Sequence, residues 1–251
     1  MVGPLWPALL VRPLDAVIVV AALVMAGVHV LSPVVRFSDE QARSRLLSFA
    51  GGVSVSYVFV HLMPELNAAA DVVGSETVVV GMIPHQRVYI VALLGFVVFY
   101  GLERYVRCSW VDTDAEQPEG IFWFHVGSFA AYNALIGYLL VHRELTGAQG
   151  VLWFAVAMGM HFFVNDASLR HHHSDVYRRT GRWVLAATVL VGTAVGFLVD
   201  VGEPVLMLLF AFLGGSVVLN AIKEELPEHR DSRFWSFVAG AGGYTGLLVF
   251  A

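Results

Sequence analysis

Long apolar stretches separated by short polar connections are the dominant pattern along this chain. Eight stretches of about 18 to 24 residues are each long enough to cross the ~30 Å hydrocarbon core of a bilayer as one helix. They cover residues 14–34, 46–69, 87–107, 121–142, 149–169, 181–200, 203–222 and 233–250. The pattern predicts an all-α bundle of eight transmembrane helices that forms a single domain over residues 1–251.

Composition agrees with this pattern. The 251 residues are 57% hydrophobic and 14% charged, and the mean hydropathy is +0.70, which is outside the range of soluble globular domains. We therefore expect the lipid bilayer to be the main partner of this chain, and we expect neither a nucleic-acid partner nor an enzymatic activity. The first span is expected to be a retained helix and not a cleaved signal peptide.

Basic residues in the connections predict the orientation, because Lys and Arg accumulate on the cytoplasmic side. With both termini outside, twelve Lys and Arg fall on the inner side and three on the outer side: Arg36, Arg43, Arg45, Arg104, Arg107, Arg170, Arg178, Arg179, Arg182, Lys223, Arg230 and Arg233 against Arg12, Arg87 and Arg143. This predicts an integral protein of the plasma (inner) membrane. The single cysteine, Cys108, then lies at the cytoplasmic side and is expected to stay reduced.

The stretch from Met158 to Asp166 places three polar residues, His161, Asn165 and Asp166, inside the fifth apolar span. Buried polar and ionisable residues in a membrane helix are costly, so they indicate a functional site by default. The fourth span, which runs in the opposite direction, carries Tyr132 and Asn133 at a similar depth. These five residues are the candidate site. In the alternative interpretation, His161 only hydrogen-bonds to Asn133 or Tyr132 and holds the two helices together.

Other intramembrane histidines have simpler explanations. His29 in the first span is interpreted as a side chain bonded to a neighbouring helix, with metal ligation as the alternative. His61 and Glu65, one helical turn apart, share a face of the second span and are secondary candidates near the outer surface. The run His171–His173 at the inner surface is interpreted as part of an interfacial basic belt, with a metal-docking site as the alternative.

The second and seventh spans share a pattern at one offset of 163 residues. In the second span, Gly51 and Gly52 precede His61 and the pair Pro64-Glu65, and in the seventh, Gly214 and Gly215 precede Glu224 and the pair Pro227-Glu228 at the same spacing. Glu224 is therefore a further secondary candidate. Two such spans of opposite direction are typical of inverted-repeat transporters, whose substrate site lies near the midplane at the repeat interface. Coincidence between two glycine-rich helices is the alternative.

Eight helices in a three-two-three arrangement, with both termini outside, resemble the ZIP (Zrt/Irt-like) divalent-metal transporters. The second span ends in His61-x-x-Pro64-Glu65 and the seventh in Leu226-Pro227-Glu228. The family pattern His-Asn-x-x-Asp/Glu-Gly falls on residues 132–137, where Asn133 and Gly137 are kept but the His and the acid become Tyr132 and Ile136. The pattern His-Glu-x-Pro-His-Glu falls on residues 161–166, where His161 is kept and the acid at the end is Asp166, whereas the first acid, the Pro and the second His are lost.

This resemblance implies a carrier that moves a divalent cation toward the cytoplasm by alternating access, with zinc expected first and iron or manganese as alternatives. The implied metal site is degenerate, because Asn and Tyr are poor substitutes for carboxylate and imidazole ligands. A metal-binding or regulatory membrane protein that no longer transports is the second hypothesis. An intramembrane metal hydrolase, with His61, His161 and His171–His173 as its candidate residues, is the third. Small-residue helix faces are compatible with a homodimer and equally with packing inside one chain.

Overall fold

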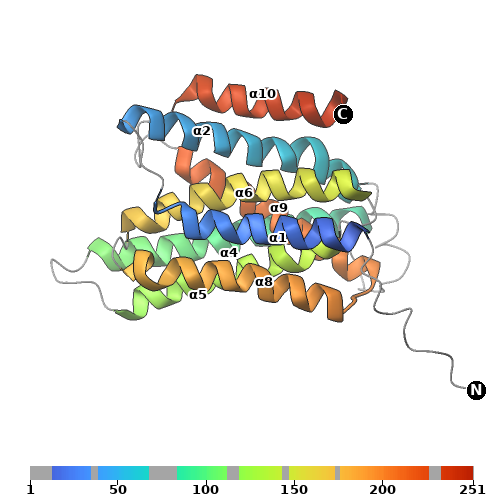
Figure 1. Cartoon of the computed structure of the whole chain (residues 1–251), viewed down its shortest axis with the longest axis horizontal. Coiled ribbons are helices and arrows are strands. Elements are labelled where there is room, and N and C mark those ends of the chain that lie inside the picture. Colours follow the sequence, from blue (N-terminus) through green and yellow to red (C-terminus); the bar gives the residue numbers. More distant parts are fainter. Residues whose placement is uncertain are drawn as a thin grey trace, which may run out of the picture.

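The computed structural model describes residues 13–34, 39–67, 84–111, 119–142, 147–172, 176–225 and 233–250, and in these ranges all regular secondary structure is helical (Figure 1). The elements are α1 (Pro13–Leu31), α2 (Glu40–Ser56) with the π-helical turn η2 (Tyr57–Leu62), α4 (Pro84–Val111), α5 (Glu119–Val141), α6 (Gly147–His172), the π-helical turn η4 (Tyr177–Gly181) with α8 (Arg182–Leu198), α9 (Glu203–Glu225) and α10 (Phe234–Phe250). The all-α prediction is confirmed, and each predicted span overlaps one of these helices.

Seven of the described helices are long and apolar enough to cross a membrane. The eighth, α10, is a shorter apolar helix of 17 residues. Figure 1 shows the helices side by side and successive ones running in opposite directions, so that α1 begins and α10 ends at the same end of the bundle. We call this the terminal end and the other the distal end. These helices make the protein an integral membrane protein, since a helix satisfies most of its backbone groups within its own segment.

Helices α2 and α10 pack with their backbones in contact (Figure 1). A Cβ atom added to Gly52 of α2 would meet the backbone oxygen of Phe237, and one added to Gly240 of α10 would meet the backbone oxygen of Phe49. Such close approach requires glycine, because any side chain would hold the two helices apart.

The pair α4 and α9 repeats this contact. A Cβ atom on Gly215 of α9 would meet the backbone oxygen of Ala92, and one on Gly95 of α4 would meet that of Phe212. Gly215 and Phe212 of α9 lie 163 residues after Gly52 and Phe49 of α2. Gly240 and Phe237 of α10 lie 145 residues after Gly95 and Ala92 of α4. The two helix pairs therefore use the same residue spacing for the same kind of contact.

Helices α5 and α8 also meet backbone to backbone. A Cβ atom on Gly137 would meet the backbone oxygen of Val189, and one on Gly192 would meet that of Ala134. Helices α1 and α6 pack differently: the nearest neighbour of a Cβ atom on Gly159 of α6 would be a methyl group of Val28, 3.9 Å away. Between α1 and α6 there remains an apolar groove of about 760 Å³.

The π-helical turn Tyr57–Leu62 follows from Pro64. Proline lacks an amide hydrogen, and its ring clashes with the carbonyl four residues earlier, so a regular α-helix is distorted just before it; residues 63–67 are α-helical again. The chain relaxes into a wider turn, in which the Met63 N–H donates to the Val58 oxygen five residues back. Such turns are frequent at functional sites, and this one carries His61.

Candidate functional site

Three helices bring one residue each to a hydrogen-bonded group near the distal end of α1. His29 Nδ1 lies 2.8 Å from Asp166 Oδ1, and Asn133 Nδ2 lies 2.9 Å from His29 Nε2. The side chains of His29 and Asp166 are 1% and 0% exposed, and Asn133 is buried as well. An amide NH₂ can only donate, so Nε2 of His29 accepts and its Nδ1 carries the hydrogen that is donated to Asp166.

A second buried group lies one turn away on α6. Asn165 Nδ2 donates to His161 Nε2 at 2.9 Å, and the ring of Tyr132 stands edge-on to that of His161 with 5.7 Å between centroids. Within the described residues, the Tyr132 hydroxyl and the side-chain oxygen Oδ1 of Asn165 have no hydrogen-bond partner. This group therefore holds two polar atoms whose bonding capacity is unused.

All five predicted site residues are buried, but they form two groups. His161 and Asp166 are five positions apart, which turns their side chains by about 140° around the helix axis. His29 holds Asp166 and Asn133 together, while Asn165 and Tyr132 stay with His161. In the part of the chain that the structure describes, no three His, Cys, Asp or Glu side chains lie close enough to hold one metal ion.

The end of α1 that carries His29 is fixed from two sides. Arg170 Nη1 on α6 donates to the Ser32 oxygen at 2.9 Å, and Arg182 Nη1 on α8 donates to the Val30 oxygen at 3.3 Å. The last carbonyls of a helix lack partners within it and carry partial negative charge, so two guanidinium groups stabilise this end. They set the height of His29 relative to Asp166.

Asp166 is the most unusual residue of the site. Its Oδ1 accepts from His29. Tyr177, at the start of η4, interacts with the same carboxylate electrostatically and through a side-chain hydrogen bond, and Arg170 adds a further electrostatic attraction. A buried carboxylate is normally fully paired, because desolvation of an unpaired charge is costly. Asp166 is therefore a buried carboxylate stabilised by an imidazole, a hydroxyl and a guanidinium group.

The secondary candidates lie elsewhere. His61 Nε2 pairs with Glu65 Oε1 at 3.2 Å, as the shared face predicted, and both side chains are half-buried. They belong to the terminal-end part of the second span, whereas His29 lies two residues before the distal end of α1. The side chains of Glu224, His171 and His172, and all of His173, lie outside the part of the structure that is described.

Two features of the site were missed by the sequence analysis. His29 was interpreted as a residue bonded to a neighbouring helix, which is confirmed, but its partner is the Asp166 carboxylate itself. Lys223, assigned to an inner connection, is instead 8% exposed and paired with Glu103 Oε2 at 2.6 Å. A signal for the first was available, because an intramembrane Asp requires a partner and His29 is the only His in the first span.

Comparison with known proteins adds no family to this picture, because no protein-family model and no curated protein matches the chain. The class that the fold defines is an all-helical integral membrane protein with a buried polar site between α1, α5 and α6.

Proposed function

We propose that this chain is a ZIP-like carrier that moves a divalent cation toward the cytoplasm by alternating access. The observation that carries the proposal is the Asp166 carboxylate, which is fully buried between membrane-spanning helices, with His29 at 2.8 Å from its Oδ1. Intramembrane carboxylates of this kind mark ion pathways, because the cost of burying them is compensated when a cation binds.

The proposed architecture is an inverted repeat, with α1, α2 and α4 related to α8, α9 and α10 around a central pair, α5 and α6. Two observations support it. The pairs α2–α10 and α9–α4 use glycines at the same spacing, and α2 and α9 run in opposite directions (Figure 1). An axis that exchanges these pairs would also exchange α5–α8 with α6–α1, and both of these pairs are in contact. Substrate sites of such repeats lie at the interface of the halves, and the His29–Asp166 group lies between α1, α5 and α6.

The residues present fit a weakly and transiently held divalent cation as substrate. His29 and Asp166 are good ligands once a cation replaces the hydrogen that His29 Nδ1 donates to Asp166 Oδ1 and that proton is released. Asn133 adds an amide oxygen after rotation of its side chain, so three helices would contribute one ligand each. A closed zinc site takes four strong ligands, and this group supplies two. Modest affinity suits a carrier, which has to release its substrate on the other side.

A different contact in each half supports alternating access. Helices α5 and α8 touch backbone to backbone, whereas α1 and α6 leave a groove between them. In an inverted repeat, the two halves can exchange such arrangements, which would alternately expose the site to either side. We further propose that the terminal end faces outward and the distal end, with most of the Lys and Arg, faces the cytoplasm.

One observation favours the second candidate, a binding or regulatory protein that no longer transports. Ile136 and Phe162, which occupy positions where the resemblance implies acids, are fully buried. The Phe162 ring lies against the His29 ring with 4.5 Å between centroids. An aromatic ring at this place blocks approach to His29 from one side and adds no ligand.

The experiment that separates the two candidates is uptake by purified protein in sealed vesicles, with zinc, iron(II) and manganese compared against vesicles without protein. A carrier gives saturable accumulation of at least one metal inside the vesicles. Metal binding to the solubilised protein without accumulation of any of the three would favour the second candidate.

A further inference from the structure

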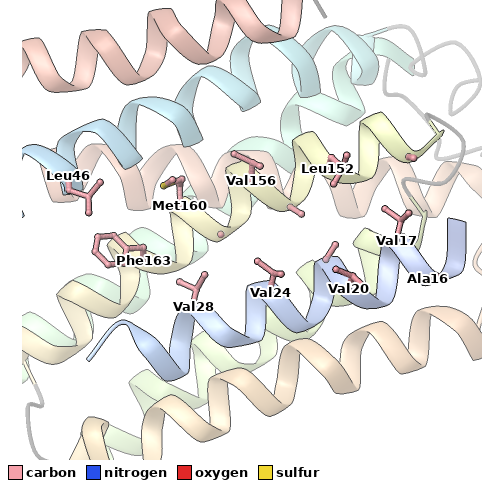
Figure 2. A pocket seen from close by; sticks show the side chains of 14 residues that line it. Ala16, Val17, Val20, Val24, Val28, Leu46, Leu152, Val156, Met160 and Phe163 are labelled. Atoms are coloured by element: carbon pink, nitrogen blue, oxygen red, sulfur yellow. The ribbon is translucent and has the colours of Figure 1, made fainter. Parts of the chain in front are cut away.

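The groove between α1 and α6 has the length and the lining of a binding site for one acyl chain (Figure 2). Its lining runs on α1 from Ala16 to Val28 and on α6 from Ala148 to Phe163, and every lining residue is apolar. Twelve residues of helix correspond to about 18 Å, and one leaflet of the ~30 Å hydrocarbon core contributes about half its thickness. An extended lipid tail therefore fits along the groove, parallel to the helices.

Small side chains make the groove deep. Ala21 of α1 and Ala155 and Gly159 of α6 line it together with larger neighbours. At α5–α8, small residues of the same kind let two helices touch, whereas here the faces stay apart. Figure 2 shows Val20 and Val24 of α1 projecting toward α6 across the gap. A gap of this size between two membrane helices has to be filled with apolar matter, since van der Waals contact is lost wherever a void remains.

Two arginines flank the distal end of the groove, where Leu46 and Phe163 lie. Arg43 precedes Leu46 by three residues, and Arg170 follows Phe163 by seven, so each shares a helix face with a lining residue. The two guanidinium groups are close enough to repel each other. This end of α2 and of α6 lies at the membrane surface, where a lipid headgroup would lie.

Each arginine keeps donors available for an anion. Arg43 Nη1 pairs with Glu40 Oε1 at 3.0 Å, but Glu40 is 80% exposed, and such exposed pairs are weak. Arg170 uses Nη1 for the Ser32 oxygen and Nε for the Asp166 backbone oxygen. A guanidinium has five N–H donors, and Nη2 of neither arginine bonds to a described residue. A phosphate between them would relieve their repulsion and accept these donors.

We propose that the α1–α6 groove binds an anionic phospholipid, with one acyl chain along the groove and the headgroup phosphate between Arg43 and Arg170. The lipid would then lie next to the two helices that carry His29 and Asp166. This inference goes beyond the proposed function and does not depend on it, because lipid binding is measured without any metal.

Native mass spectrometry of the purified full chain in mild detergent, with added phosphatidylglycerol or phosphatidylcholine, tests the proposal. We expect phosphatidylglycerol to be retained more strongly, by about fivefold for each arginine that it contacts. Arg43→Gln should remove about that factor, whereas Arg45→Gln, which changes an exposed arginine two positions along α2, should leave retention unchanged. Arg43 is half-buried near the surface, so this variant is expected to fold.

A second pair of variants tests whether the groove holds the acyl chain. Val24→Trp fills the groove, and Val191→Trp places the same side chain on α8, outside the groove; the two valines are 62% and 57% exposed. Loss of the retained lipid only in Val24→Trp supports the proposal. Equal retention of both lipids, or equal loss in both tryptophan variants, would mean ordinary surrounding lipid and overturn it. A dimer that Val24→Trp dissociates would show that a second copy fills the groove, which also overturns it.

Discussion

Helix pairs α5–α8 and α1–α6 occupy equivalent places in the proposed repeat, yet they are held together in different ways. Glycines bring the backbones of α5 and α8 into direct contact, so that pair has little freedom to separate. Helices α1 and α6 are joined at the distal end by the His29–Asp166 and Arg170–Ser32 hydrogen bonds, and they leave an apolar groove toward the terminal end. Hydrogen bonds between membrane helices contribute about 0.6 kcal/mol on average. The second pair is therefore the one expected to move.

The largest difference should appear when the same residue change is made in both pairs. Gly192→Ala forces a methyl group against the Ala134 backbone, which cannot give way, and over-packing of this kind costs about 1 to 3 kcal/mol or more. Gly159→Ala meets only the Val28 methyl at 3.9 Å and gains up to about 1 kcal/mol of helix propensity. Thermal unfolding in detergent should show a strongly lowered Tm for the first variant and an unchanged or raised Tm for the second. Equal losses would mean that α1 and α6 are packed as rigidly as α5 and α8.

The freedom of α1 relative to α6 can be removed by a disulfide. In a Cys108→Ser background, Val28→Cys and Gly159→Cys place two thiols where a Cβ atom on Gly159 would lie 3.9 Å from a methyl group of Val28, so that a disulfide is sterically accessible. We expect oxidation to abolish metal uptake by vesicles while Tm stays the same or rises, and reduction to restore uptake.

Each single-cysteine variant serves as a control and should transport with or without oxidant. Full uptake by the oxidised double variant would show that α1 and α6 do not need to separate.

A carboxylate next to His29 should strengthen the site. The Phe162 ring lies 4.5 Å from the His29 ring, so Phe162→Glu adds an acid beside the existing pair and should tighten metal binding by on the order of tenfold. The added charge is buried without a metal, so Tm of the metal-free variant should fall. Ile136→Glu, at the other position where the resemblance implies an acid, is expected to act in the same direction.

Phe163→Glu is the matched control, because Phe163 lines the groove on another side of α6 (Figure 2). Isothermal titration with zinc should detect tighter binding in Phe162→Glu only. The same gain in Phe163→Glu would mean that added charge attracts metal without regard to position.

The smallest effect is expected from labelling Cys108, which reports orientation without changing function. Cys108 is exposed near the distal end of α4. An impermeant maleimide should leave it unlabelled in intact cells and label it after lysis. Labelling of intact cells would reverse the proposed orientation of both helix pairs.

The helices themselves could be predicted because each is long and apolar enough to be recognised alone. Burial of Asn133, His161 and Asp166 could also be predicted, since polar residues in such spans avoid lipid. Their division into two groups could not. It depends on the rotation of α6 about its axis and on the height of α1, which Arg170 and Arg182 set from helices far away in the chain.

The groove and the burial of Lys223 could not be predicted from the sequence either, for a related reason. Whether two small-residue faces meet, as at Gly137 and Gly192, or stay apart, as at Gly159, depends on how the other helices hold them. Lys223 is near the end of its helix, where a basic residue usually reaches the surface. Its burial is made favourable by the neighbouring Glu103 and by the Phe129 ring, whose centroid lies 5.7 Å from Nζ.

Asp166→Asn tests whether Asp166 binds a cation, because the change keeps the size of the side chain and an acceptor for His29 but removes the charge. We expect uptake of zinc, iron(II) or manganese by vesicles to fall to the level of vesicles without protein, while Tm of the metal-free protein stays close to that of the parent. Uptake equal to that of the parent would contradict a cation site at Asp166, and unfolding of the variant would assign the carboxylate to holding α1 and α6 together.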